Sequence, residues 1–176
     1  MTERKSKSRK VVRDGLKQTS RILLDLAEGL LKTPVHGWRG PLRKPSDYDA
    51  YNEYWEEHRR VKMLEKKRLI KLRKVGDRIE YKLTNDGWHE TLKLRIMSSE
   101  AKLPEGELCI VTFDIPEDIR NVRDTFRYVL KKAKFKQSQR SVWTSNRDVA
   151  RELAELAKAL RAQKYIHIYS GSKIEL

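Results

Sequence analysis

The sequence predicts an α+β protein in which an N-terminal winged helix-turn-helix domain is followed by a ferredoxin-like domain of order βαββαβ. Two observations favour this class. In the first half, apolar residues recur at helical spacing and then alternate with polar ones, in the order helix, irregular segment, basic helix, hairpin, helix. In the second half, the pattern is strand, helix, two strands, helix and strand. Between the halves, residues 99–106 are small, polar and punctuated by Pro and Gly, which predicts a linker.

The net charge points to the kind of partner. The 176 residues include 40 Lys and Arg against 25 Asp and Glu, a net charge of +15. This excess favours a polyanionic partner, because each neutralised phosphate releases counterions. No apolar run approaches the roughly 20 residues of a membrane span, and the first residues lack the apolar middle of a secretory signal. The single cysteine, Cys109, excludes a disulfide framework and an all-cysteine zinc site. We therefore expect a cytoplasmic protein without a membrane partner.

The N-terminal half divides into an arm and a domain. Residues 1–14 are basic and nearly free of large apolar side chains, which predicts a flexible arm. Residues 15–98 form the predicted winged helix-turn-helix domain. Its first helix ends at Pro34, and a second helix runs from Tyr48 to about Arg68 after a cap at Ser46 or Asp47. A hairpin over residues 70–83 and a short helix then follow. The apolar face of the first helix is formed by Leu16, Ile22, Leu23, Leu26 and Leu30.

Residues 107–176 form the predicted ferredoxin-like domain, which we expect to dimerise. Residues 108–113 are apolar on both faces, as in a central buried strand. Pro116 opens the next helix, with Asp114 as a candidate cap. Residues 135–144 read as one or two strands, and residues 165–169 as the last strand. Ser145 and Asp148 resemble a capping box for a helix over residues 149–160.

The strongest candidate site is the basic helix with its hairpin. Arg59 to Lys74 hold nine basic residues and one acidic residue. If Trp55, Val61 and Leu64 face the core, the opposite helix face is basic and suits the major groove of DNA. The alternative to DNA binding is that the charged helix and hairpin are simply exposed to solvent. The expected DNA-binding residues are Arg59, Arg60, Lys62, Lys66, Lys67, Arg73, Lys74, Arg78 and Lys82.

A second basic surface is predicted on the helix after Pro116. Steps of three, four, four and three residues bring five cations onto one helix face, where like charges repel each other. They call for a compensating anion, which is either phosphate or carboxylates across a dimer interface. The five residues are Arg120, Arg123, Arg127, Lys131 and Lys134.

Aromatic and histidine residues receive no chemical role. The four histidines share no metal-ligand spacing. An aromatic cluster is expected to pack inside its domain or against a dimer partner; it consists of Tyr48, Tyr51, Tyr54 and Trp55.

One stretch of the second half resembles a known protein family. It is residues 111–146, VTFDIPEDIRNVRDTFRYVLKKAKFKQSQRSVWTSN. They contain a strand ending in Phe113-Asp114-Ile115-Pro116-Glu117, the spaced arginines, and Gln139-Arg140-Ser141-Val142-Trp143. This stretch resembles the central domain of PaaX-type transcriptional repressors. Through that domain it is similar to the small ferredoxin-like subunit of the CRISPR spacer-acquisition machinery. The N-terminal half resembles the repressors in pattern only. The repressor family is longer, with a further C-terminal domain, and it usually has Gly where Lys134 stands here.

The resemblance implies a sequence-specific double-stranded DNA-binding transcriptional regulator, a repressor, that acts as a homodimer. No cofactor is expected, and the identity of any small-molecule effector is open. The alternative is a CRISPR-associated nuclease-like or integration-complex subunit. In nuclease-like relatives an aspartate at this strand end binds a metal, so Asp114 would bind Mg²⁺ or Mn²⁺. A third class, a nucleic-acid scaffold without regulation, is also open. We expect a binding protein rather than an enzyme, because no second carboxylate accompanies Asp114 at ligand spacing.

Overall fold

The computed structural model describes residues 19–28, 48–75 and 78–172, without the side chains at the start of the second helix and at the hairpin tip. The chain divides into two compact units, residues 1–91 and 92–176. The predicted arm and the segment around Pro34 to Pro45 lie outside the described residues. None of the described helices is both long and apolar enough to cross a bilayer.

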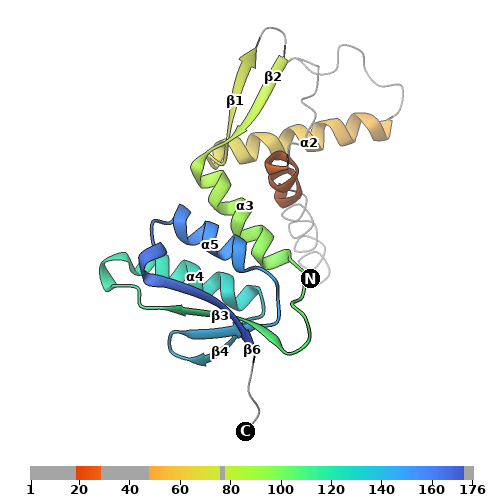
Figure 1. Cartoon of the computed structure of the whole chain (residues 1–176). Coiled ribbons are helices and arrows are strands. Elements are labelled where there is room, and N and C mark those ends of the chain that lie inside the picture. The colour runs from red at the N-terminus through yellow and green to blue at the C-terminus, as the bar shows by residue number, and fades with distance from the viewer. Residues whose placement is uncertain (1–18, 29–47, 76–77, 173–176) are drawn as a thin grey trace, which may run out of the picture. The chain divides into compact units, whose positions relative to one another are not determined.

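The first unit contains helices and one hairpin (Figure 1). Residues 19–27 are helical, and α2 (Tyr48–Lys66) is one unbroken helix. The hairpin consists of β1 (Ile70–Val75) and β2 (Arg78–Leu83), and α3 (Asn85–Ser98) follows it. The predicted apolar faces are confirmed in part, because Ile22, Leu23, Val61 and Leu64 are all less than a tenth exposed. Leu26 and Trp55 are half-buried, and Leu16 and Leu30 lie outside the described residues. The order of elements from α2 to α3 is therefore the predicted one.

Thr84 joins the hairpin to α3. Its backbone N–H donates to the carbonyl of Leu69 at 3.1 Å, and its hydroxyl donates to the carbonyl of Arg68 at 2.6 Å. The same hydroxyl accepts the N–H of Gly87 at 3.0 Å, as an N-terminal helix cap does. The end of α2, the root of the hairpin and the start of α3 are thus held at one point.

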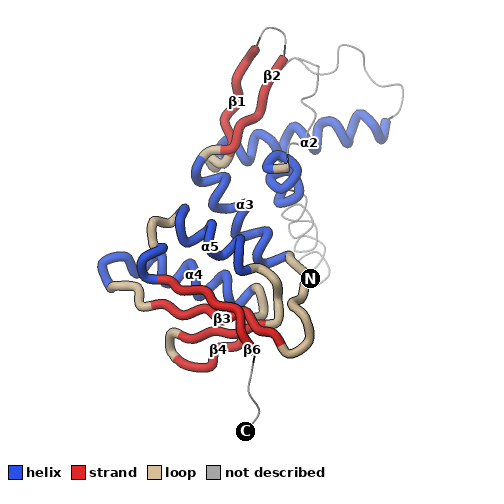
Figure 2. Tube along the Cα trace, viewed as in Figure 1, coloured by secondary structure: helices blue, strands red, loops and turns tan. Residues whose placement is uncertain are grey.

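The second unit has the predicted order βαββαβ (Figure 2). The elements are β3 (Glu107–Phe113), a 3₁₀ turn (Glu117–Ile119), α4 (Arg120–Lys132), β4 (Lys136–Gln139), β5 (Val142–Ser145), α5 (Ala150–Ala159), a second 3₁₀ turn (Gln163–Tyr165) and β6 (Ile166–Ser172). The antiparallel sheet has the strand order β4-β5-β3-β6. The α+β class is confirmed, and the order of these elements is that of a ferredoxin-like arrangement.

The two helices of this unit lie on one face of its sheet (Figure 1). The core between them is formed by buried side chains that include Val111, Phe113, Phe126, Trp143 and Leu153. The strand register places Ile110 opposite Thr144 and Tyr169, and Thr112 opposite Val142 and His167, all on the other face. Tyr169 is 54 % exposed, and His167 is exposed beside it with the two rings stacked.

Two predicted helix caps are wrong. The 3₁₀ turn before α4 begins after Pro116 without a side-chain cap, and the carboxylate of Asp114 is exposed and does not cap it. Helix α5 begins after Val149, also without a side-chain cap. Ser145 is instead the last residue of β5, and its hydroxyl accepts the N–H of Arg147 at 3.3 Å. Ser145, which the capping-box pattern assigned to the start of a helix, therefore pairs in the sheet instead.

Residues 99–106, the predicted linker, are hydrogen-bonded within the second unit. Lys102 forms a β-bridge with Arg147, and the N–H of Leu103 donates to the carbonyl of Asn146 at 2.8 Å. The guanidinium of Arg147 donates to the carbonyl of Ser99. The segment is therefore attached to the loop between β5 and α5.

Three helices end with a basic residue in the left-handed region. Arg68, Lys134 and Arg161 have φ of 58°, 62° and 55°. After α4, the N–H of Phe135 donates to the carbonyl of Leu130 at 3.0 Å, and that of Lys134 donates to the carbonyl of Lys131 at 3.1 Å. These two bonds form a Schellman motif, which normally uses Gly at the left-handed position. Lys134 therefore occupies the left-handed position after α4, where the PaaX-type repressors that this stretch resembles usually have Gly.

Replacing Lys134 by Gly is expected to stabilise the second unit by about 1 kcal/mol, because Gly removes the clash of a Cβ in the left-handed conformation. Chemical denaturation of the full chain would measure the change. Lys131→Gly, inside α4, is the matched control and should destabilise by about 1 kcal/mol. Destabilisation by both substitutions would contradict the assigned helix end.

Candidate nucleic-acid interface

Helix α2 presents a basic face to solvent. Val61 and Leu64 are 8 % and 0 % exposed and form the buried face of the helix. Arg59, Lys62 and Lys66 follow one another at helical steps of three and four residues and are exposed, as is Lys67. Side chains at these steps lie along one side of a helix. The sequence therefore placed Val61 and Leu64 on the buried face, and Arg59, Lys62, Lys66 and Lys67 on the exposed side, of α2 correctly, whereas Arg60 is largely covered.

Glu56 partly neutralises the start of this basic face. Its carboxylate forms an ion pair with Arg59 at 3.0 Å and another with Arg60 at 3.5 Å. The Arg60 side chain is only 22 % exposed, whereas that of Arg59 is 72 % exposed. Arg60 is thus the least accessible of the predicted DNA-binding residues on α2. Ion pairs this exposed contribute at most about 1 kcal/mol, so a phosphate can compete with Glu56.

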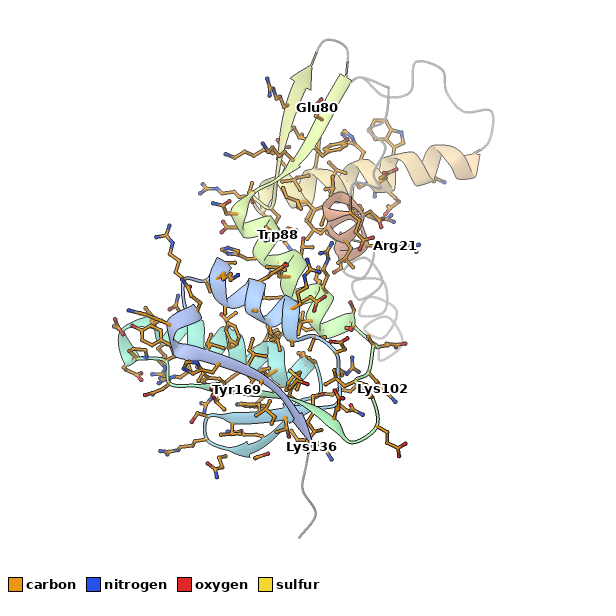
Figure 3. All side chains as sticks on the ribbon, viewed as in Figure 1. Arg21, Glu80, Trp88, Lys102, Lys136 and Tyr169 are labelled. Atoms are coloured by element: carbon orange, nitrogen blue, oxygen red, sulfur yellow. The ribbon has the colours of Figure 1, made fainter. Side chains whose placement is uncertain are left out.

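The hairpin adds a second group of cations in the same unit. Lys71 in β1 lies directly opposite Lys82 in β2, and Arg73 lies opposite Glu80. All four side chains are exposed, and alternation along each strand places them on one face. Figure 3 shows Glu80 on this hairpin. Lys71 was missed in the sequence, because only the strand register shows that it faces Lys82. The backbones of Lys74 and Arg78 belong to the hairpin, but their side chains are outside the described part.

Like charges directly opposite each other destabilise a sheet. The Lys71–Lys82 pair therefore reduces the stability of the hairpin and favours an anion near it.

His58 also lies on α2, where its ring contacts Trp55 edge to face with the centroids 5.8 Å apart. Burial and the charge of Lys62 lower the pKa of His58, so the neutral ring adds no charge to this surface near neutral pH. The side chains of the three tyrosines in the predicted aromatic cluster are outside the described residues.

The second predicted basic surface divides into two parts. Arg120 pairs with Glu117 at 3.5 Å and with Asp124 at 3.6 Å. Arg123 also binds Glu117 and donates to the carbonyl of Ile115 at 3.5 Å. The hydrogen bond from Arg123, with the charges of Arg123 and Arg120, lowers the pKa of Glu117. Carboxylates of the same unit thus compensate the first part of the stripe.

The rest of the stripe has different surroundings. Arg127 donates to the carbonyl of Arg140 at 3.2 Å, while Lys131 and Lys134 are exposed. Sequence spacing could not separate the two parts, since Glu117 comes from the 3₁₀ turn that precedes the helix.

Asp114 lies at the end of β3 with its side chain exposed, and its backbone N–H donates to the carbonyl of Tyr165 at 3.0 Å. In the described part of the chain, no three His, Cys, Asp or Glu residues are grouped so as to hold a metal ion.

Cys109 is buried in β3, and burial together with the charge of Asp148 raises the pKa of its thiol to about 11. The thiol is therefore protonated at neutral pH and belongs to the core.

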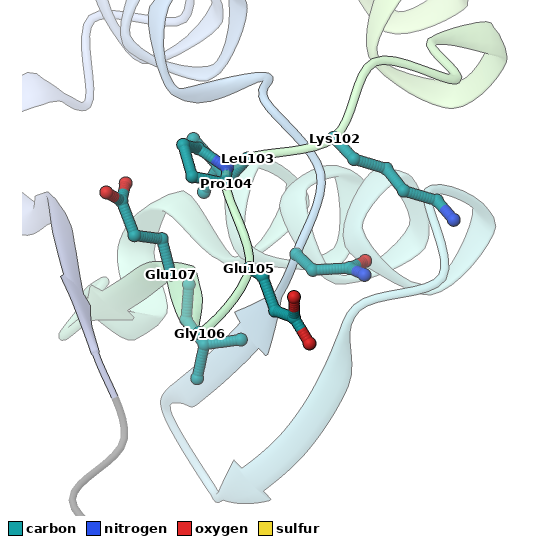
Figure 4. Close-up of a pocket in the computed structure, with 8 residues that line it drawn as sticks. Lys102, Leu103, Pro104, Glu105, Gly106 and Glu107 are labelled. Atoms are coloured by element: carbon teal, nitrogen blue, oxygen red, sulfur yellow. The ribbon is translucent and has the colours of Figure 1, made fainter.

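An open hollow lies beside the turn that leads into β3 (Figure 4). Its charged side chains are one amine, from Lys102, and two carboxylates, from Glu105 and Glu107. This excess of carboxylates disfavours phosphate. The lining residues are Lys102, Leu103, Pro104, Glu105, Gly106, Glu107, Leu108 and Asn146.

Comparison with known families identifies the second unit. Residues 103–176 match the family model described as the PaaX protein central Cas2-like domain. A search of curated proteins gave no match to the chain, and neither did a search of solved structures. The match covers the strand, helix and hairpin whose residues carried the resemblance in the sequence. The predicted resemblance to the PaaX-type family is thus confirmed for residues 103–176, which match the PaaX central Cas2-like domain.

Proposed function

We propose that this protein is a sequence-specific double-stranded DNA-binding transcriptional regulator, a repressor, that acts as a homodimer. One observation carries the proposal: a region that matches the PaaX central domain follows, in the same chain, a helix and hairpin that expose more cations than carboxylates. In their described part, the exposed cations are Arg59, Lys62, Lys66, Lys71, Arg73 and Lys82, and the exposed carboxylates are Glu56, Glu57 and Glu80. Many folds support several functions, so the basic surface is the argument for DNA and the family is the argument for regulation.

The first unit acts as a winged helix. Helix α2 enters the major groove with Arg59, Lys62 and Lys66, while the hairpin is the wing and brings Lys71, Arg73 and Lys82 to the backbone. Support comes from the separation of the apolar and basic faces of α2 and from Thr84, which holds the root of the hairpin.

The second unit pairs two copies of the chain. Among the described residues, helices of this unit cover one face of its sheet, and the other face combines Leu108 and Ile110 with the exposed ring of Tyr169. A second copy that covers this face would hold two DNA-binding units at a fixed spacing, as an inverted-repeat operator requires.

The test is to select bound sequences from a random duplex library with the full chain and to measure its sedimentation. An inverted repeat and a dimer are the expected results. A monomer, or binding without any sequence preference, would contradict the proposal.

The alternative of a metal-dependent nuclease-like subunit has one observation in its favour, the exposed carboxylate of Asp114 in a Cas2-like domain. A hydrolytic metal site needs further ligands to position the ion and the attacking water. Incubation of DNA and RNA with Mg²⁺ or Mn²⁺ decides between the two functions. Cleavage by the wild type that Asp114→Ala abolishes would establish the alternative.

Glu56→Gln is expected to increase the affinity for a selected duplex about two- to fivefold, because it releases Arg59 and Arg60 from a weak surface ion pair and removes a charge that repels phosphate. Titration of a labelled duplex would measure the change. The control Glu155→Gln breaks a comparable pair with Arg151 on α5 and should leave the affinity unchanged. Equal effects of both substitutions would mean that only net charge matters.

A further inference from the structure

The segment from the middle of α4 to the loop after β5 contains no acidic residue. Residues 125–147 include seven Lys and Arg and neither Asp nor Glu. The exposed cations at the end of α4 and along β4 form what we call the β4-edge surface, which consists of Lys131, Lys132, Lys134, Lys136 and Arg140. We propose that the β4-edge surface binds the phosphate backbone of duplex DNA without reading its sequence. This inference rests on the proposed function, to which it adds a second contact.

Two of these cations, Lys136 and Arg140, lie on an open edge of the sheet, and the other three lie at the end of α4 that leads into it. Strand β4 is the outermost strand of the order β4-β5-β3-β6, and all four of its residues are exposed. Lys136 begins the strand, as Figure 3 shows, and Arg140 follows its end in the turn to β5. Four residues of strand span about 13 Å. Lys136 and Arg140, at the two ends of β4, are therefore far enough apart to meet different phosphates of one DNA strand.

The turn that carries Arg140 is held in place. The carbonyl of Arg140 accepts one hydrogen bond from the guanidinium of Arg127 at 3.2 Å and another from the amide of Gln137 at 3.0 Å. At the other end, the hydrogen bonds at Lys134 and Phe135 fix the exit from α4. The backbone that carries the cations is thus ordered before binding, which lowers the entropy cost of association.

The positive charge of the β4-edge surface is not compensated by carboxylates of the described residues, whereas the positive charge at the start of α4 is. There, Glu117 and Asp124 pair with arginines. Within the described chain, the five cations of the β4-edge surface take part in no ion pair; Lys132 lies over the ring of Tyr128, with 5.8 Å from its Nζ to the ring centroid. Lysines on an edge strand also discourage aggregation, which accounts for Lys136 but not for cations that lie off the strand.

The composition of the edge favours nucleic acid over a protein partner. The side chains of β4 are Lys, Gln, Ser and Gln, and all four are exposed. Protein–protein interfaces have an apolar core, whereas DNA interfaces are polar and basic, and Gln and Ser commonly donate to phosphates. Strand β4 itself supplies these donors and no apolar side chain, while the exposed ring of Tyr128 lies beneath Lys132 on α4.

The experiment uses the full chain with Lys131, Lys134 and Lys136 replaced by Gln. The control replaces three exposed lysines elsewhere in the same unit, Lys102, Lys158 and Lys164, and so has the same net charge. Each variant is titrated with a duplex of unrelated sequence and with the selected duplex at about 50 to 200 mM salt. An acidic polypeptide serves as a second ligand, and thermal unfolding checks the fold.

For the edge variant we expect at least about a tenfold loss of affinity for both duplexes and a fall of about 2.7 in the slope of log affinity against log salt, since each phosphate contributes about 0.9. The control should keep the wild-type slope, and the selected sequence should stay the same. If the edge variant matches the control on both duplexes, the β4-edge proposal fails while the proposed function stands. Loss of binding to the acidic polypeptide alone would assign the edge to a protein partner and overturn the inference. If the wild type binds neither duplex, the proposed function itself fails.

Discussion

Replacing Arg59, Lys62 and Lys66 together by Ala is expected to lower the affinity for the selected duplex at least about 10³-fold, since each base or phosphate contact contributes about 1–3 kcal/mol. These side chains are exposed on one face of α2, opposite the buried Val61 and Leu64. Their removal leaves the core of the unit untouched. Titration of the selected duplex would measure the loss, and sedimentation should give the oligomeric state of the wild type.

The matched control removes the same charge elsewhere, with Lys102, Lys158 and Lys164 replaced by Ala. It should lose little specific affinity, because these residues lie in the second unit and outside both basic surfaces. If the α2 variant still selects the wild-type sequence, α2 is not the recognition helix. If the control loses as much as the α2 variant, the interaction depends on net charge and the specific interface argued above is wrong.

Periodicity in the sequence was sufficient to place α2, the hairpin and the main elements of the second unit. Burial follows directly from apolar spacing, so Val61 and Leu64 lie in the core as predicted. The basic face of α2 could be predicted for the same reason, since it is what remains when the apolar face is assigned.

Features that depend on residues brought together by tertiary structure could not be predicted. The neutralisation of Arg120 and Arg123 depends on a 3₁₀ turn that folds Glu117 back onto the helix. The Lys71–Lys82 pair depends on strand register, and the loss of the expected cap at Ser145 depends on the length of β5. The β4 edge became visible as a surface only when the strand order made β4 outermost.

Gly87 at the start of α3 is the position where the smallest substitution should have the largest effect on stability. A Cβ at this position would lie 1.9 Å from the carbonyl oxygen of Leu69 and 2.9 Å from its carbonyl carbon, both backbone atoms. The oxygen already accepts a hydrogen bond from the N–H of Thr84 at 3.1 Å. Any shift that relieves the clash therefore breaks the junction between the hairpin and α3.

Gly87→Ala is expected to destabilise the first unit by about 3 kcal/mol, the upper range for overpacking, because backbone cannot move aside as a flexible side chain can. DNA affinity should fall with it, since the hairpin loses its fixed root. Amide hydrogen exchange over α2 and the hairpin would report the first unit separately from the second. The control is Gly171→Ala in β6, where a Cβ would lie 3.8 Å from the Ile110 side chain, an ordinary contact, so the change should stay within about 0.5 kcal/mol. Unchanged exchange in Gly87→Ala would show that α3 does not pack against Leu69 as described, and with it the argument for a rigid wing would fail.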